Sequence, residues 1–337
     1  NYKKQQNTKS IIMKIIEHSY GADLKWVSKL ANLFGGKVEG NFIKVPEESQ
    51  KGTRYVLDCG SGIIAYFLNI EYKKSFRLVQ KNTGSDFVGF YYNLTEGEAS
   101  LSGDNFNFEV GKWQFNLTVL DGTLESSYNI KARSKSFVLC IFIKKKTLKH
   151  YFSKLKSSNS ETIFNSSKNT IVRFDRMSDE SYHLINDLRK LTPGGAIFDL
   201  NLAGTVHILL GNFLKKMTSQ RIIIQKVNKA DLAAIISCQK YLLENIVNPF
   251  PSIKIMANIA NMSESKFKTL FKKITGKTPS NFFMDNKLVL AKNLLEKKQL
   301  TIMQVSQRLN FISNSYFSAR FKQRFGMSPK RYLQHCN

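Results

Sequence analysis

The sequence predicts an α+β multidomain protein. It combines an N-terminal antiparallel β-barrel or jelly roll, a helical linker region and a C-terminal all-α domain with two helix-turn-helix motifs. Three observations lead to this fold class. Short β-rich runs fill residues 40–145, helical periodicity returns after residue 178, and one motif occurs twice within residues 253–333. A length of 337 residues suits two to three domains. We place them at 1–150, 151–228 and 229–337.

A helix is expected over residues 10–34, ahead of the β-rich region. Apolar residues recur there at spacings of three and four, which places them on one helical face, and a glycine pair ends the pattern. These residues are Leu24, Val27, Leu30, Ala31 and Phe34, followed by Gly35 and Gly36.

From about residue 40 the apolar period changes to two, and Gly, Asn and Asp separate the runs. Eight short strands at such spacing predict an antiparallel barrel or jelly roll. The expected strands cover 54–58, 63–72, 76–81, 87–94, 106–110, 114–120, 128–132 and 137–144.

A small barrel can hold one ligand in its mouth, so the aromatic residues of this region are candidates for a pocket lining. The alternative is that they fill the core, which is the more frequent role for any one of them in a small barrel. They are Tyr66, Phe67, Phe76, Phe87, Phe90, Tyr91, Tyr92, Phe106, Phe108, Trp113 and Phe115.

The β-rich region offers no catalytic constellation. A metal-dependent barrel of the cupin type needs His and carboxylate ligands on its strands, yet none of the five histidines lies in residues 40–145. Ser61 stands between two glycines as in a nucleophile elbow, but the strand-turn-helix context is missing. The four cysteines are scattered without a CxxC pair and are expected to be reduced thiols. We therefore expect no enzyme, no metal site and no cofactor.

Residues 145–170 are polar and are expected to form a linker. A helix should follow from an N-cap at Ser178, and a second one over about 196–218. The second helix either packs on its own barrel or forms a homodimer interface, and both alternatives stay open. No run of 18 or more apolar residues exists, so no membrane-spanning segment is expected. The apolar stripe of the second helix consists of Val206, Leu209, Leu210, Phe213, Leu214 and Met217.

The duplicated motif organises the C-terminal third of the chain. Phe271 and Gly276 of the first copy recur fifty residues later as Phe321 and Gly326. Each copy has a short helix, a tight turn and a Phe-bearing helix, which is the form of a helix-turn-helix that reads DNA. The expected helices cover 231–245, 252–260, 263–275, 280–297, 302–309 and 313–325. In the last of these we expect Tyr316, Phe317 and Phe321 to point inward.

The charge of the chain favours a polyanionic partner. The formal net charge is +26 and the sequence pI is about 9.8. Residues 229–337 hold 18 Lys and Arg against 5 Asp and Glu, so this third is about twice as basic per residue as the rest. A high lysine content that only keeps the protein soluble is the alternative, and it suits the N-terminal part better.

The residues of the repeat resemble the AraC/XylS family of bacterial transcription regulators over about 229–335. The family places an effector-binding barrel before its DNA-binding domain, which the β-rich region matches by layout alone. The resemblance implies two reading helices that a linker helix holds in successive major grooves, about 34 Å apart. It is carried by Ala257, Met262, Ser263, Phe267, Phe271, Lys272, Gly276, Pro279, Ala291, Leu294, Leu295, Ile302, Phe311, Tyr316, Phe317, Ser318, Phe321, Lys322, Gly326, Ser328 and Pro329.

The resemblance also implies residue roles. The base-facing candidates are Ser265, Lys268 and Thr269 in the first reading helix, and Asn314, Ser315, Ser318 and Ala319 in the second. Lys272, Lys273, Lys322 and Arg324 are expected to contact phosphates, which position the protein without reading sequence. Lys266 completes the polar face of the first helix. For each single lysine, a solvated surface position is the alternative.

Four positions depart from the family pattern. Asn310 stands where many relatives carry Gly in the second turn, and Asn tolerates the left-handed conformation that this turn needs. Asn261 is expected to do the same job in the turn of the first copy. Ser306 replaces a usual Ala. Lys287 replaces a usual Arg on the linker helix and lacks its planar fork. Ala319 replaces a frequent Arg, so one base contact is expected to be missing. These positions are read from the sequence alone.

The function expected from all this is a sequence-specific DNA-binding regulator, an activator by the family's habit, in the bacterial cytoplasm. Its expected partners are double-stranded DNA, RNA polymerase as the family implies, a small-molecule effector and a second copy of the chain. Two alternatives stay open: a barrel that is a ligand-free structural or protein-interaction module, and an enzyme with an attached DNA module.

Overall fold

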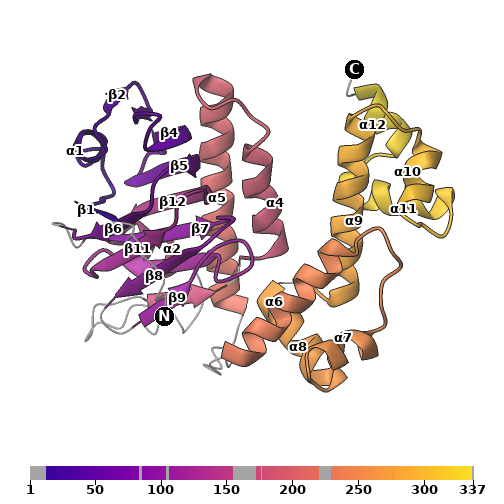
Figure 1. The fold of residues 1–337 in the computed structure, drawn as a ribbon. Helices are drawn as coiled ribbons and strands as arrows, with labels where there is room; N and C mark the ends of the chain where they lie inside the picture. Colours follow the sequence, from indigo (N-terminus) through magenta and orange to yellow (C-terminus); the bar gives the residue numbers. More distant parts are fainter. Residues whose placement is uncertain are drawn as a thin grey trace, which may run out of the picture. The chain divides into compact units, whose positions relative to one another are not determined.

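The computed structural model describes residues 13–82, 86–103, 106–154, 172–175, 177–219, 229–275 and 277–335. Its chain divides into two compact units (Figure 1). Unit 1 comprises Asn1–Arg176 and Ser181–Ile224, and unit 2 comprises Met177–Glu180 and Gln225–Asn337. The residues that open helix α4 (Asp179–Leu188) therefore belong to unit 2, although the rest of this helix belongs to unit 1.

Unit 1 is built on two β-sheets. A five-stranded sheet has the order β1-β6-β11-β8-β9, and an eight-stranded sheet has the order β13-β10-β7-β12-β5-β4-β3-β2. Neighbouring strands are antiparallel except β1 and β6, which are parallel. The strands are β1 (Lys14–His18), β2 (Lys37–Glu39), β3 (Phe42–Lys44), β4 (Gln50–Asp58), β5 (Ile63–Tyr72), β6 (Phe76–Gln80), β7 (Phe87–Asn93), β8 (Ala99–Gly103), β9 (Phe106–Glu109), β10 (Leu117–Asp121), β11 (Ser126–Ile130), β12 (Lys135–Lys144) and β13 (Val172–Asp175).

The central strands β5 and β12 are buried on both faces. Because side chains alternate along a strand, Tyr66 and Cys140 face the interior shared with the five-stranded sheet, where the main apolar cluster lies. Phe67 and Phe137 lie on the opposite face, with ring centroids 5.5 Å apart. Burial of both faces explains why these strands read as continuous apolar runs and not as strict alternation.

Helix α5 (Gly195–Ser219) covers the outer face of the eight-stranded sheet. Phe198 packs edge-on against Phe67 at 5.3 Å between ring centroids, and Phe213 packs against Phe90 at 4.8 Å. The buried stripe of α5 thus packs on the chain's own eight-stranded sheet, while Met217 lies outside the described side chains; the two sheets do not by themselves confirm the expected barrel or jelly roll. The other helices of unit 1 are α1 (Val27–Leu33), α2 (Lys145–Ser153) and most of α4.

Over Gly195–Lys215, α5 is also long and apolar enough to cross a membrane by length and composition, with 39% of that window buried. Asp199 and Asn201 interrupt this stretch, so it contains no uninterrupted run of 18 apolar residues. Length and composition are weak evidence here, because a helix that packs on a sheet passes the same test.

The eight expected strands are all present, with ends shifted by a few residues. The expected helix over 10–34 is wrong: among its described residues, which begin at 13, the first part is β1 and only α1 is helical. The five apolar residues at helical spacing extend beyond α1 at both ends, and β1 forms through pairing with a distant strand. The polar linker is also wrong for its first residues. These form α2, which buries Leu148 and Phe152 under its lysines.

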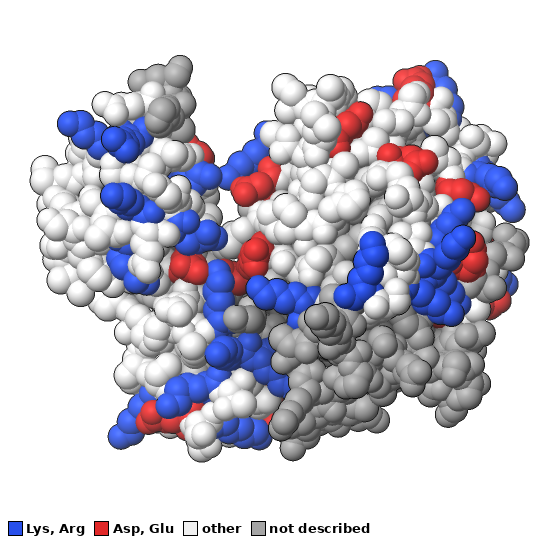
Figure 2. Space-filling view, turned by 180° about the vertical axis from the view of Figure 1, so that it is seen from behind, with Lys and Arg blue, Asp and Glu red and all other residues white. Residues whose placement is uncertain are grey.

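Unit 2 is all helical in its described residues. Helix α9 contacts α6 and α8 on one side of the repeat and α10, α11 and α12 on the other. Figure 2 shows Lys and Arg outnumbering Asp and Glu over the visible face of this unit, at the left of the view. The helices are α6 (Lys229–Glu244), α7 (Ile253–Ile259), α8 (Glu264–Thr275), α9 (Pro279–Glu296), α10 (Ile302–Arg308), α11 (Asn314–Phe325) and α12 (Pro329–His335).

Candidate functional site

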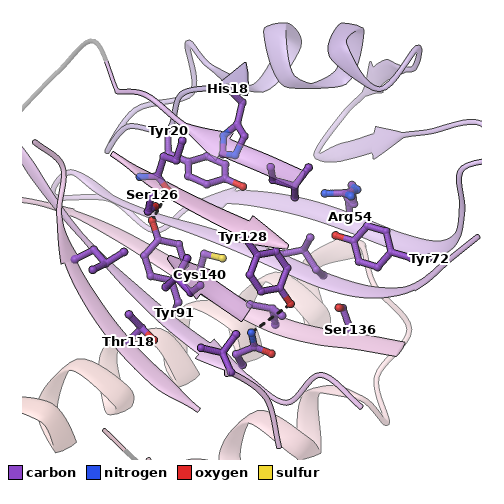
Figure 3. Close-up of a pocket in the computed structure, with 18 residues that line it drawn as sticks. His18, Tyr20, Arg54, Tyr72, Tyr91, Thr118, Ser126, Tyr128, Ser136 and Cys140 are labelled. Carbon is purple, nitrogen blue, oxygen red and sulfur yellow. Dashed lines mark hydrogen bonds between the residues drawn. The ribbon is translucent and has the colours of Figure 1, made fainter. Parts of the chain in front are cut away.

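A cavity lies between the two sheets of unit 1, with about 710 Å³ of space free of protein atoms including its mouth. Figure 3 shows the labelled side chains converging on it from both sheets. The lining residues are His18, Tyr20, Arg54, Leu68, Tyr72, Leu78, Gln80, Tyr91, Asn93, Leu101, Val110, Thr118, Leu120, Ser126, Tyr128, Ser136, Val138 and Cys140.

Of the aromatic residues that the sequence offered as pocket candidates, Tyr91 lines this cavity, and most of the others fill the core. The structure adds Tyr20, Tyr72 and Tyr128, which sequence reasoning did not select. Arg54 was taken only as the start of a strand. One signal could have found it: Arg54 shares a strand face with Val56, which is a core residue, so its register already pointed inward.

Several ionisable groups around the cavity are held neutral. Burial raises the pKa of the Tyr128 and Tyr66 hydroxyls to about 12, and it also raises the pKa of the Cys140 thiol. Burial, with a smaller contribution from the Arg54 charge, lowers the pKa of His18 to about 4. At neutral pH the guanidinium of Arg54 is therefore the one charge on the described lining.

The two Phe-bearing helices of unit 2 are structural copies. Helices α8 and α11 have 12 residues each and start fifty positions apart. Ser313 caps α11 by accepting a hydrogen bond from the Tyr316 amide at 3.1 Å, and the Ser263 hydroxyl accepts from the Lys266 amide at 3.3 Å. Caps of this kind satisfy amides that have no intrahelical partner. Each of the two helices therefore begins directly after its serine.

The turns before these helices have the conformation that the sequence predicted. Asn261 has a φ of 51° and Asn310 a φ of 50°, both in the left-handed region. Asparagine enters this region at low cost. The Asn310 amide also donates to the Val247 carbonyl at 3.0 Å, so the second turn is held from outside the motif.

The inward faces of α8 and α11 are held by Phe267, Phe271, Phe317 and Phe321, all fully buried. The site residues that the sequence predicted lie on the other faces. Lys273 and Ser318 are half-buried. The remaining nine are exposed: Ser265, Lys266, Lys268, Thr269, Lys272, Asn314, Ser315, Ala319 and Lys322.

Tyr316 differs from expectation, and Arg324 and Lys266 have acidic neighbours that the sequence did not predict. Tyr316 is 37% exposed and not inward, because it lies about 100° round the helix from Phe317. Arg324, expected at phosphates, is half-buried, with its Nε 3.9 Å from Asp285 Oδ1. Lys266 is exposed but forms an ion pair with Asp231 of α6, at 2.9 Å between Nζ and Oδ1.

Lys287 of α9 connects two separate segments of unit 2 by hydrogen bonds. It is 3% exposed, and its ammonium donates to the carbonyls of Asn248 at 2.7 Å and Leu309 at 2.9 Å. Asn248 lies in the loop after α6, and Leu309 ends α10. The residue therefore joins the loop that precedes the repeat to the turn of the second motif. Burial lowers the pKa of Lys287 to about 8.

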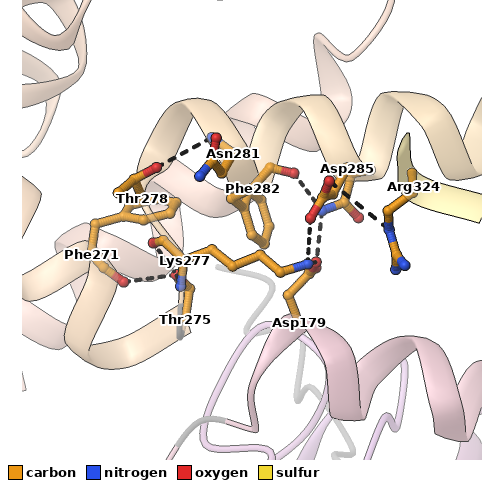
Figure 4. Close-up of polar contacts among 10 residues, drawn as sticks. Asp179, Phe271, Thr275, Lys277, Thr278, Asn281, Phe282, Asp285 and Arg324 are labelled. Atoms are coloured by element: carbon orange, nitrogen blue, oxygen red, sulfur yellow. Dashed lines mark hydrogen bonds and ion pairs between the residues drawn. The ribbon is translucent and has the colours of Figure 1, made fainter. Parts of the chain in front are cut away.

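A second polar network holds the start of α4 within unit 2 (Figure 4). The buried Asp179 accepts from Lys277 Nζ at 2.8 Å and from Asn286 Nδ2 at 2.9 Å. Lys277 also donates to Asp285 at 2.6 Å, and Asp285 faces Arg324 of α11. Burial opposes the charge of Lys277, yet the two carboxylates raise its pKa. The network connects α4, α9 and α11.

Comparison with known proteins identifies the C-terminal part. A family described as a helix-turn-helix domain matches residues 256–335. The HTH-type transcriptional regulator AlkR of Acinetobacter baylyi is 39% identical over 83 residues, which are 25% of this chain and 27% of AlkR. The probable transcriptional regulator LumQ of Photobacterium leiognathi is 28% identical over 123 residues, 36% of this chain and 49% of LumQ.

One relative aligns beyond this region. The RCS-specific HTH-type transcriptional activator RclR of Escherichia coli is 22% identical over 248 residues, which cover 72% of this chain and 84% of RclR. The chain spans half or less of the length of the first two relatives. The family match coincides with the two motifs that end in α8 and α11. Residues 256–335 are therefore a helix-turn-helix domain of the AraC type, and the chain carries a DNA-binding domain of the AraC/XylS family.

Proposed function

We propose that the protein is a sequence-specific DNA-binding transcription regulator and that it activates transcription. One observation carries the proposal. Two copies of a capped helix, α8 and α11, bury their Phe faces and leave basic and polar faces exposed on one helix-linked unit. Such helices are the parts that enter major grooves in helix-turn-helix proteins. The similarity to RclR, a transcriptional activator, supports activation, and RNA polymerase is the partner that activation requires.

The proposed contacts divide between the two reading helices. Ser265, Lys268 and Thr269 of α8 face bases, and so do Asn314 and Ser315 of α11, because Asn and Lys can each form paired hydrogen bonds with a base edge. Lys272 and Lys322 contact phosphates. Arg324 is left out, since it faces Asp285. Ser318 of α11 is half-buried and stays a proposed base contact, whereas Ala319 is exposed but has no polar atom to offer a base.

Unit 1 is proposed as the regulatory part, a cupin-like domain that takes up an effector in its cavity. The functional division would then fall near residue 229, with 1–150 as the effector domain and 151–228 as the linker. A regulator needs no catalytic group, and we propose no enzymatic activity and a cytoplasmic location. A unit 1 that only binds another protein is the second candidate, favoured if the cavity takes no ligand.

A second copy of the chain is the proposed occupant of the exposed stripe on α5. Ile197 and Leu200 are each 74% exposed and Ile208 is 47% exposed, on the face opposite the sheet. Gly204 and Gly211 lie along the same stripe with open space at their Cβ positions. Two such stripes can approach closely, and their self-complementarity suits a two-fold dimer. Leu200→Glu should shift the protein to monomer in analytical ultracentrifugation at about micromolar concentration.

The test of DNA reading is selection of bound duplexes from a random pool, followed by affinity measurements on the selected site and on a scrambled control. We expect two short boxes about one helical turn apart, bound at least ~10³-fold better than the control. Equal binding to every duplex, falling only with salt, would mean that charge alone attracts DNA and would refute sequence reading.

A matched pair of variants sharpens this test. Lys268→Ala removes an exposed residue of the proposed base-reading face of α8, and Lys254→Ala removes an exposed lysine of α7. The first should lower the preference for the selected site over the scrambled one, and the second should leave that preference unchanged. If both variants lower the preference equally, α8 does not read bases.

A further inference from the structure

The guanidinium of Arg54 lies at the cavity wall and is 2% exposed. Its Nε and Nη2 atoms donate to Gln50 Oε1 at 2.9 and 2.7 Å, and Nη1 donates to the Tyr66 hydroxyl at 2.5 Å. The guanidinium plane stacks on Phe34, with 4.4 Å between Cζ and the ring centroid. These contacts fix the orientation of the side chain, yet they use only three of its five N–H donors.

Every described partner of Arg54 is neutral. Gln50 and Tyr66 accept its hydrogen bonds, Phe34 and Tyr72 contribute aromatic rings, and no described carboxylate forms an ion pair with it. Arginine stays protonated in proteins, so the charge persists inside unit 1. A buried charge without a counter-ion is costly, and structures normally pair it. The surroundings of Arg54 therefore favour a bound anion.

The rest of the cavity indicates what carries that anion. The other described lining residues include no Asp, Glu or Lys. Aliphatic side chains supply much of the wall: Leu68, Leu78, Leu101, Val110, Leu120 and Val138. The remainder is polar but uncharged, mainly tyrosines and short hydroxyl side chains, and the Tyr91 hydroxyl is already engaged with Gln80 at 2.9 Å. Such a wall suits an apolar body and offers no second charged contact.

His18 supplies a second, independent observation. It is 6% exposed, lines the cavity from β1, and its Nδ1 atom has no described hydrogen-bond partner. Figure 3 shows the imidazole directed from β1 toward the interior near Tyr20. Unpaired buried polar atoms are rare in native proteins. A ligand with a polar group near its anionic end would satisfy this atom.

We propose that the cavity of unit 1 binds a monocarboxylic acid with an apolar body, with its carboxylate at Arg54 and its body among the aliphatic side chains between the sheets. The inference deepens the proposed function, on which it rests for treating this cavity as the effector site. A carboxylate matches the planar fork of arginine by forming two parallel hydrogen bonds. An amine or a dicationic ligand would meet repulsion from Arg54 and is excluded by the same contact.

The experiment compares acids with alcohols of the same shape on the unaltered full-length chain. Octanoate is paired with 1-octanol and 4-phenylbutyrate with 4-phenyl-1-butanol, and binding is measured by isothermal titration calorimetry. We expect at least one acid to bind about tenfold or more tightly than its alcohol. Equal binding within a pair, or no binding of either acid at about 1 mM, overturns the proposal. Inorganic phosphate should bind far more weakly, since it has no apolar body.

Two variants assign the carboxylate to Arg54. Arg54→Gln should abolish the preference for acid over alcohol, whereas Arg54→Lys should retain part of it because the charge remains. Arg77→Gln on β6 is the matched control, since Arg77 is exposed, and it should bind acids as the unaltered protein does. If Arg54→Gln does not fold, the comparison within each acid and alcohol pair still decides the outcome.

The same samples are measured for DNA affinity, so the two proposals fail separately. If acids bind but the DNA affinity does not change, the ligand assignment is supported and the proposed effector role is refuted. Specific DNA binding with no acid binding keeps the regulator and overturns the ligand assignment.

Discussion

At the scale of single residues, Lys287 has an unusual setting for a charged side chain. Its ammonium is buried and bonded to two backbone carbonyls, one in the loop between α6 and α7 and one at the C-terminal end of α10. The resemblance to regulators with Arg at this position raised the question whether a bidentate contact was lost. In this structure the ammonium of Lys287 donates to two separate carbonyls, which its three N–H donors allow.

The first prediction concerns how the free energy of unfolding depends on pH through Lys287. Folding lowers the pKa of Lys287 from 10.5 to about 8, so between these values the unfolded chain holds more protons than the folded one. The free energy of unfolding should therefore rise with pH over this window. Urea unfolding of the protein and of Lys287→Met at pH 7, 8.5 and about 10 measures it. Stability should rise more with pH in the unaltered protein than in the variant.

The control for this prediction is Lys297→Met, which changes an exposed lysine at the C-terminal end of the same helix. It should follow the pH curve of the unaltered protein. Parallel pH curves for the unaltered protein and Lys287→Met would show that Lys287 does not titrate in this window.

The second prediction, also at the residue scale, separates base reading from charge. Asn314→Ala removes an exposed amide at the start of α11 without changing charge. Affinity for the selected site should fall by about 1–3 kcal/mol, with non-specific affinity unchanged. Filter binding or fluorescence anisotropy on both duplexes measures the difference. Gln304→Ala on α10 would disturb a capping box instead, so it does not serve as a control. Gln307→Ala, exposed on the same helix, should leave both affinities unchanged.

At the scale of elements, α4 is distinctive because its first residues are held by unit 2. Asp179 is bonded to Lys277 and Asn286, and through Asp285 the network reaches α11. The proline, glycine and asparagine signals that place each helix say nothing about this connection, since the partners are about one hundred positions apart.

The third prediction tests that network. Asp179→Asn removes a buried carboxylate, and the stability of unit 2 should fall by about 1–3 kcal/mol. Hydrogen exchange of the α9 amides reports this loss locally. Asp187→Asn is the control: its ion pair with Lys190 is exposed, and exposed pairs contribute roughly 0–1 kcal/mol. Equal effects of the two substitutions would mean that the network does not stabilise unit 2.

Elements with local sequence signals could be predicted, whereas elements that depend on pairing with a distant segment could not. The eight strands expected within residues 54–144 and the helices of unit 2 are encoded locally, by turn residues, serine caps and apolar spacing. Strand β8 (Ala99–Gly103) was missed. Strand β1 is not: Ile15 and Ile16 form a very short apolar run, and parallel pairing with β6 makes it a strand. The exposed sides of α8 and α11 followed from Phe spacing, whereas Tyr316 was misplaced because its aromatic ring was taken as a sign of burial.

The cavity was beyond sequence reasoning for a related physical reason. Arg54 was visible as a charged residue at the start of a strand, but its neighbours Gln50, Tyr66 and Phe34 come from β4, β5 and the end of α1. No local pattern brings these together. A sequence can indicate that a charge points inward. Only the paired strands show that, among the described residues, no Asp or Glu side chain forms an ion pair with it.

At the scale of the whole molecule, the net charge of +26 raises the question of which lysines meet DNA. Unit 1 carries exposed lysines too, and Lys25 has a side chain that is 91% exposed. If general charge attracted DNA, removing any of them would weaken binding. If unit 2 alone contacts phosphates, only the removal of lysines from unit 2 will weaken DNA binding.

The fourth prediction uses the salt dependence of DNA affinity to decide. The slope of log affinity against log salt changes by about 0.9 for each phosphate contact. Lys272→Ala should reduce the slope by about one contact, and Lys25→Ala should leave it unchanged. Equal changes in both variants would indicate non-specific attraction by the whole chain.

Trp26 stands beside the cavity and provides a natural optical probe of it. Its indole ring lies 5.0 Å from the ring of Tyr20 and 5.3 Å from that of Tyr66, the residue that accepts from Arg54. The chain has two tryptophans, and Trp113→Phe would leave this one alone. Occupancy of the cavity that displaces either tyrosine should change the emission of Trp26. The protein can thus be titrated by intrinsic fluorescence, without a label and in the presence of DNA.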